Sequence, residues 1–146
     1  MVLFKYKVFR IYSKNFVLFH NFNNNHKRRI NHINFNTAQF RYTGQYRTDI
    51  TYKSTNEIGK LFKPSSKIVI AYKNNQMTKE EYTKQYYELM RNSYQQNKEK
   101  WKNVLNQSRL VFVCFCNLQK VDFCHRLLLK DILIKLGAIY DGEIEI

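Results

Sequence analysis

Two neighbouring segments indicate the architecture of this chain: Leu110-Val-Phe-Val-Cys-Phe-Cys116, and the apolar-striped segment that opens at Cys124-His-Arg126. The first is β-branched and aromatic without polar alternation, which predicts a central strand over 110–116 covered on both faces. Apolar residues then recur at helical spacing until Gly137, which predicts a helix over 124–136. Ligands commonly bind beyond the carboxyl end of such a strand, where the N–H groups of the next helix favour anions. We therefore expect the functional site at this junction.

The segments before it are shorter. Residues 37–43 alternate enough to form a first strand, with a turn at Gly44-Gln45, and residues 49–53 suggest a second short strand. A proline and two serines precede residues 67–73, which predicts a helix there. The triplet Ile68-Val-Ile70 favours a strand instead, so both interpretations stay open.

The clearest helix start is Thr78-Lys-Glu-Glu81, which has the pattern of a capping box. Its apolar stripe begins at Tyr82 and, after a polar interruption, resumes at Trp101, which predicts one long bent helix or two. Alternating Glu and Ile at residues 143–146 predict an edge strand. Strands alternating with helices predict an α/β fold, a small parallel or mixed sheet with helices packed over it.

Composition and charge restrict the class of protein. The chain has 146 residues, 44% hydrophobic, and a formal charge of +14. Residues 1–36 hold seven Lys or Arg and no acid, so residues 37–146 carry 18 basic and 11 acidic groups. This excess of basic residues favours phosphate-bearing partners such as a nucleotide or nucleic acid. The sequence gives no indication of the oligomeric state. We predict no membrane segment, and the odd number of cysteines is typical of a cytoplasmic protein rather than a disulfide framework.

Residues 1–36 differ in composition from the rest because they are basic and contain eight asparagines. We interpret them as a poorly ordered extension and residues 37–146 as a single α/β domain. A basic, acid-free start could also mimic a transit peptide or a nucleic-acid arm.

The cluster of Cys124, His125 and Arg126 carries the candidate chemistry. A thiol at a helix start beside an imidazole and a guanidinium should have a lowered pKa, so Cys124 is the candidate nucleophile. His125 would act as acid or base, and Arg126 would clamp a phosphate through two donors. Cys116, eight residues before Cys124, is a candidate resolving thiol or second ligand. No glycine-rich phosphate loop is present, and the sequence leaves the cofactor unknown.

Four hypotheses follow from this cluster. It could belong to an enzyme acting on a nucleotide or nucleic acid, or to a non-catalytic module that binds a nucleotide or another anion. It could hold zinc through Cys114, Cys116, Cys124 and His125, although C-x-C with adjacent Cys-His is not a familiar zinc spacing. It could also be core packing, with Arg126 paired to an acid such as Glu143.

A first-strand loop often shares the crevice with the central strand of an α/β sheet. Three charged residues lie around the predicted first turn and are therefore candidate substrate-binding residues. They are Arg41, Arg47 and Asp49. A surface ion pair near a turn is an equally good interpretation of them.

Several short motifs occur together between residue 37 and the end of the chain. They are Phe40-Arg-Tyr42, Asp49-Ile-Thr51, Phe62-Lys-Pro64, Glu81-Tyr82 with Tyr86, Arg91-Asn-Ser-Tyr94, Trp101, Cys114-Phe-Cys116 and Phe123-Cys-His-Arg126. With these motifs the chain resembles a family of bacterial and phage proteins catalogued as domain of unknown function four-eight-eight. The resemblance implies a small α/β domain with a Cys-His-Arg pocket, common in phage and prophage neighbourhoods. It implies no particular reaction.

Overall fold

The computed structural model describes residues 32–146, so the predictions for residues 1–31 lie outside the described part of the chain. Its elements follow in chain order. They are β1 (Asn34–Gln39), β2 (Arg47–Asp49), the short 3-10 helix η1 (Gly59–Leu61), α3 (Ser66–Lys73), α4 (Lys79–Gln96), α5 (Lys98–Leu105), β3 (Arg109–Cys114), α6 (His125–Lys135) and β4 (Ile139–Ile144).

The four strands form one parallel sheet in the order β2-β3-β1-β4. The predicted α/β fold is thereby confirmed, and of the two sheet types considered the described strands form the parallel one. β3 lies inside the sheet because β1 and β2 pair with its two edges. This position explains its composition, since a strand buried on both faces needs apolar side chains on both.

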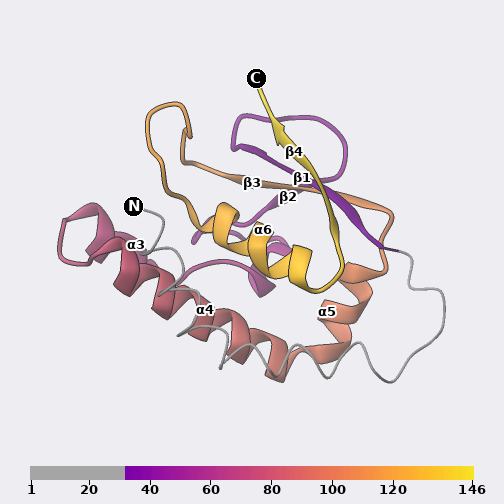
Figure 1. Ribbon diagram of the computed structural model, residues 1–146, viewed down its shortest axis with the longest axis horizontal. Helices are drawn as coiled ribbons and strands as arrows, with labels where there is room; N and C mark the ends of the chain where they lie inside the picture. Colours follow the sequence, from indigo (N-terminus) through magenta and orange to yellow (C-terminus); the bar gives the residue numbers. More distant parts are fainter. Residues whose placement is uncertain (1–31) are drawn as a thin grey trace, which may run out of the picture. The chain divides into compact units, whose positions relative to one another are not determined.

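Aromatic side chains fill the space between the sheet and the helices. The Phe112 ring of β3 meets the Phe35 ring at 5.9 Å and the Phe62 ring at 5.5 Å, and Phe62 in turn meets Trp101 at 4.8 Å. Figure 1 shows α6 close to the sheet and α4 beyond it, on the same side. Val111 and Val113 of β3 face the other way, where Phe40, Tyr42 and Ile144 pack over them.

Local signals explain the helix bounds. Thr78 and Glu81 form the predicted capping box at the start of α4. The Ser65 hydroxyl accepts a hydrogen bond from the Ile68 N–H, so residues 66–73 form a helix and not the alternative strand. Asn97, with φ −133° and ψ 37°, interrupts the helical backbone, which gives two helices rather than one bent helix.

Several predicted bounds were wrong by a few residues. β1 covers Asn34–Gln39 instead of 37–43, so the first strand begins before the boundary predicted at residue 37. β2 covers Arg47–Asp49 instead of 49–53 because the chain turns at Asp49, whose carboxylate accepts from the Thr51 N–H at 2.8 Å. β3 ends at Cys114 rather than at residue 116.

The carboxyl-terminal part follows the predicted pattern. α6 covers His125–Lys135 within the predicted range 124–136, and Gly137 follows with φ +96°, the left-handed conformation that commonly ends a helix. β4 is an edge strand, as expected, but begins at Ile139. Among the described helices, none is long and apolar enough to cross a membrane.

Candidate functional site

The predicted site lies where β2 and β3 end and α6 begins. The loop between β3 and α6 closes through Asn117, whose side chain accepts from the Gln119 N–H at 3.0 Å and whose carbonyl accepts from Lys120. A cavity of about 520 Å³ opens beside this loop, and its wall includes residues from the ends of β2 and β3, from α3 and from the start of α4. The junction therefore contains a pocket large enough for a small-molecule ligand.

All three cysteines of the chain line this pocket. The Sγ atoms of Cys114, Cys116 and Cys124 lie within 4.8 Å of one another, and none forms a disulfide. Cys114 is the last residue of β3, Cys116 lies two residues beyond, and Cys124 precedes the first residue of α6. Cys114 and Cys124 are buried and Cys116 is half-buried, so Cys116 is the thiol most open to solvent.

His125 joins the thiols to the end of β2. Its Nε2 lies 2.8 Å from the Ile50 carbonyl oxygen, which can only accept, so Nε2 carries the ring proton. Its Nδ1 lies 3.6 Å from Cys114 Sγ and 3.9 Å from Cys124 Sγ. Burial lowers the pKa of His125 to about 4, so the ring is neutral at pH 7 and the Nδ1 lone pair faces two thiols.

Arg126 is buried, with 1% of its surface exposed, and its donors are engaged within the protein. Nη2 lies 2.7 Å from the Glu143 carboxylate on β4, and Nη1 donates to the Cys116 carbonyl oxygen at 2.7 Å and approaches Cys124 Sγ at 3.7 Å. Glu143 also accepts from the Thr37 hydroxyl. Arg126 does not line the pocket. The role of an open phosphate clamp does not fit these contacts, whereas the alternative pairing with Glu143 is present.

The pKa values of Cys114 and Cys124 shift in opposite directions because their hydrogen bonds and burial differ. Hydrogen bonds from Cys116 and then Cys124 lower the pKa of Cys114. Burial, followed by the neighbouring Cys114 and Cys116, raises the pKa of Cys124. The expectation of a lowered pKa at Cys124 was therefore wrong, because its burial outweighs the guanidinium beside it.

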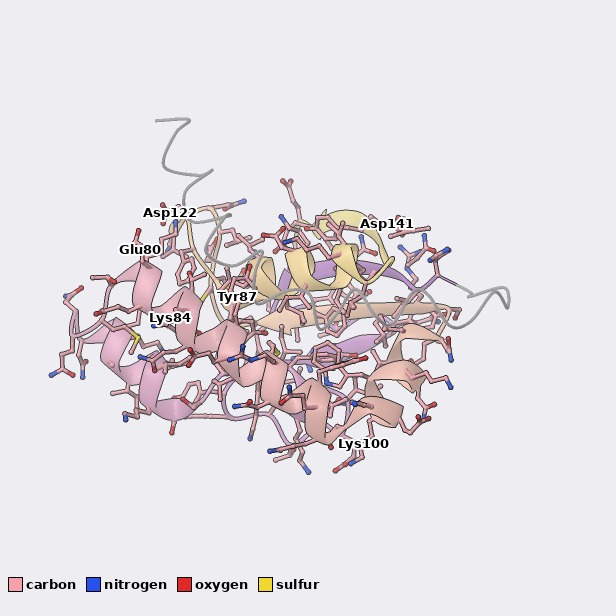
Figure 2. All side chains as sticks on the ribbon, turned by 60° about the horizontal axis from the view of Figure 1, so that its bottom comes forward. Glu80, Lys84, Tyr87, Lys100, Asp122 and Asp141 are labelled. Carbon is pink, nitrogen blue, oxygen red and sulfur yellow. The ribbon has the colours of Figure 1, made fainter. Side chains whose placement is uncertain are left out.

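Aromatic rings form much of the remaining wall. Phe123 meets Tyr72 of α3 at 5.3 Å and Tyr82 of α4 at 5.2 Å between ring centroids. Phe115 is exposed at the pocket edge. Lys79 at the start of α4 pairs with Asp122 of the loop at 3.6 Å, and Figure 2 shows Asp122 beside this end of α4. This ion pair connects the start of α4 with the loop that carries Phe115.

Two lysines and one threonine hydroxyl also line the pocket. They are Lys73, Lys120 and Thr51. Thr51 is 1% exposed, and its Oγ1 has no hydrogen-bond partner among the described residues. A buried hydroxyl without a partner is costly, so a ligand or water that reaches it would gain a hydrogen bond.

The three candidate residues of the first loop do not line the pocket. Arg47 donates to the carbonyl oxygens of Tyr42 and Phe40 at 2.7 and 2.9 Å, and its guanidinium lies 4.5 Å from the Phe40 ring centroid. Arg41 donates to the carbonyl of Ile146, and Asp49 forms the turn after β2. The contacts of Arg47 therefore stabilise the first loop, whereas those of Arg41 and Asp49 lie outside it.

Sequence reasoning missed several wall residues, among them Tyr52, Tyr72, Lys73 and Lys120. Tyr82, where the predicted apolar stripe begins, is 4% exposed and belongs to the core, and it also lines the pocket. The spacing of Tyr82 within α4 carries the helical signal, but nothing in the sequence places Tyr72 beside it.

A family model named DUF488-N3a, described as the active DUF488-N3 subclade, matches residues 23–137. The match begins before the boundary predicted at residue 37. No curated protein and no solved structure matches the chain.

Proposed function

Because the chain belongs to the DUF488 family, with a matching model described as an active subclade, we propose that its pocket is the ligand site of an enzyme. The ligand class is a nucleotide, free or within nucleic acid. The cluster of Cys114, Cys116, Cys124 and His125, hereafter the sulfur cluster, forms the reactive end of the site. The observation that carries this proposal is that one pocket combines aromatic walls, two lysines and the sulfur cluster.

The size and walls of the pocket suit a planar ring. About 520 Å³ lies within the range of small-ligand sites, which is roughly 300–1,000 Å³. Aromatic faces stack on nucleobases whatever their identity, because every base presents a π face. Phe115 and Val121 are 46% and 44% exposed, and both line the pocket, so a ring placed there would cover apolar surface that now faces solvent.

The charges suit a phosphate. Lys73 and Lys120 supply cationic donors at the wall, in a described part of the chain that is itself basic. Asp122 also lines the pocket and pairs with Lys79. We assign the phosphate to Lys73 and Lys120 instead of Arg126, because the guanidinium of Arg126 is already paired.

The sulfur cluster supplies groups that can react. Thiolates are strong nucleophiles and metal ligands, and a neutral imidazole can accept a proton at Nδ1. The unpartnered Thr51 hydroxyl offers one further hydrogen bond to a ligand that reaches this end of the pocket. Arg126 acts as a positioning residue, since it donates to the carbonyl oxygen of Cys116 and lies beside Cys124 Sγ.

Calorimetric titration of the full-length protein with AMP, adenosine and ribose 5-phosphate tests the ligand class. We expect AMP to bind most tightly, because it alone offers both the ring and the phosphate. Lys120→Gln should weaken AMP binding by about tenfold or more and leave adenosine binding unchanged, since a charge-assisted hydrogen bond is worth roughly 1.5–3 kcal/mol. Lys100→Gln is the matched control, because Figure 2 places Lys100 on α5 at the opposite end of the helix layer from Asp122.

Absence of binding by all three compounds, or equal loss with Lys120→Gln and Lys100→Gln, would contradict the ligand class. Catalysis is tested separately by mass spectrometry of nucleotides and a short single-stranded oligonucleotide after incubation with the protein. A product formed by the wild type and lost in Cys114→Ser supports an enzyme. Binding without any product would leave a non-catalytic module.

A further inference from the structure

We propose that Cys114, Cys116 and Cys124 together bind one zinc-class divalent cation as thiolates, with Nδ1 of His125 as the fourth ligand. The inference concerns the occupant of the sulfur cluster and does not depend on which ligand enters the pocket. While the cation is bound, the thiolates and Nδ1 of His125 serve as its ligands and not as nucleophile and base. Three thiols that converge from a strand end, a loop and a helix start are the observation that motivates it.

The distances approach those of a tetrahedral site. With Zn–S near 2.3 Å and Zn–N near 2.0 Å, neighbouring donor atoms of a tetrahedron lie about 3.5–3.8 Å apart. His125 Nδ1 lies 3.6 Å from Cys114 Sγ and 3.9 Å from Cys124 Sγ, close to that spacing. The three sulfurs lie within 4.8 Å of one another, so binding requires them to approach by on the order of 1 Å, which rotation of side chains can supply.

The imidazole is already in the tautomer that a metal ligand needs. Because Nε2 donates to the Ile50 carbonyl at 2.8 Å, the ring presents Nδ1 without a proton to the thiols. This arrangement, in which the second ring nitrogen is held by a backbone carbonyl, orients histidine ligands in many metal sites. Metal binding would therefore release protons only from the three thiols, and these protons would pass to solvent.

Positive charges close to the sulfur cluster would compensate the net negative charge of the metal complex. Three thiolates and one divalent cation carry a net charge of −1, and the Arg126 guanidinium approaches Cys124 Sγ at 3.7 Å. The N-terminus of α6, which begins at His125, adds partial positive charge beside the sulfurs. A site for Mg²⁺ or Ca²⁺ would need oxygen ligands, whereas thiolate with imidazole selects zinc-like ions.

Cobalt titration of the full-length protein under reducing conditions tests the site, because Co²⁺ reports its thiolate ligands by charge-transfer absorption. We expect one Co²⁺ per chain, intensity matching three thiolates, and displacement by one equivalent of Zn²⁺. Each of Cys114→Ser, Cys116→Ser and Cys124→Ser should lower affinity by more than about 100-fold, since loss of an outer partner alone typically costs 10–100-fold. His125→Gln should also weaken binding, whereas the matched control His32→Gln, at an exposed histidine outside the cluster, should not.

A second measurement needs no variant and so is independent of folding. Alkylation of each cysteine in the wild type is followed by peptide mass spectrometry with added Zn²⁺ and with a chelator. We expect Zn²⁺ to protect all three thiols together and the chelator to expose them. Substoichiometric cobalt, or alkylation rates that do not respond to Zn²⁺, would overturn the site. Unchanged affinity in His125→Gln would overturn the assignment of the fourth ligand. Neither result would bear on nucleotide binding, which is measured separately.

Discussion

Arg126 connects three parts of the fold through one side chain. Its guanidinium pairs with Glu143 on β4 and donates to the Cys116 carbonyl oxygen beyond β3, while its backbone lies in the first turn of α6. Arg126 is buried and Glu143 is half-buried, with side-chain exposures of 1% and 27%. A buried pair of this kind is weak evidence for net stability, but removing one partner leaves the other without compensation.

Arg126→Ala should therefore lower the free energy of unfolding by about 3–5 kcal/mol, measured by urea denaturation. The matched control is Lys60→Ala at the exposed pair between Lys60 and Glu57, where no measurable change is expected. Equal denaturation midpoints for the two variants would contradict the structural role of Arg126.

Tyr86 gives a prediction about alkaline pH. Its hydroxyl is buried and donates to the Phe62 carbonyl oxygen at 2.8 Å, and burial raises the pKa of Tyr86 well above its ordinary value of about 10. A raised folded-state pKa contributes stability that is complete below the unfolded pKa and is lost as the pH rises above about 10. Above about pH 10, the free energy of unfolding of the wild type should fall by up to about 1.4 kcal/mol more per pH unit than that of Tyr86→Phe.

Denaturation midpoints of the wild type and Tyr86→Phe, measured from pH 8 to 11.5, test this prediction. Tyr46→Phe serves as the control, because Tyr46 is 52% exposed, and it should follow the wild type. Parallel pH profiles for the wild type and Tyr86→Phe would refute the prediction.

Helix starts determine the elements around the pocket. α3 begins at the Ser65 cap and α4 at the Thr78 capping box, and these two helices place Tyr72 and Tyr82 with their rings 5.5 Å apart. The first turn of α4 also carries Glu80 and Glu81, whose negative charge is favourable at a helix N-terminus. The wall of the pocket therefore depends on where α4 begins.

Thr78→Ala removes the hydroxyl that accepts from the Glu81 N–H at 3.1 Å, and it should cost about 1 kcal/mol of unfolding free energy. Thr83→Ala, on the same helix, removes a hydroxyl that donates back to the Lys79 carbonyl oxygen and should be neutral or slightly stabilising. Thermal denaturation of both variants checks the difference. A larger loss of stability for Thr83→Ala than for Thr78→Ala would contradict the role of the cap in stabilising α4.

The arrangement of the whole sheet predicts which parts open last. β1 and β3 are paired on both edges, whereas β2 and β4 are each paired on one. Backbone amides of β1 and β3 should therefore exchange with solvent at free energies close to that of global unfolding, and those of β2 and β4 at lower ones. Native-state hydrogen exchange followed by NMR measures this order. Amides of β4 that are protected as strongly as those of β3 would argue against the observed strand order.

Local patterns in the sequence were sufficient to predict the interior strand, the helix that follows it and the cap of α4. Each depends on neighbours within a few residues: the uninterrupted apolar run at 110–113, the helical spacing after Cys124 and the Thr78–Glu81 pair. The same patterns predicted that a site with cysteines, His125 and Arg126 would lie at the β3–α6 junction. The bounds of the short strands β1 and β2 were predicted wrongly, because pairing with a distant partner determines where each begins and ends.

The roles within the junction required tertiary contacts. Burial and neighbouring thiols reverse the expected pKa shift of Cys124, and Glu143, distant in sequence, takes up the guanidinium of Arg126. The Ile50 carbonyl determines which nitrogen of His125 carries the proton. Desolvation and pairing act through space between segments far apart in the chain, so a local pattern can name the candidate residues but not their charge state or their partners.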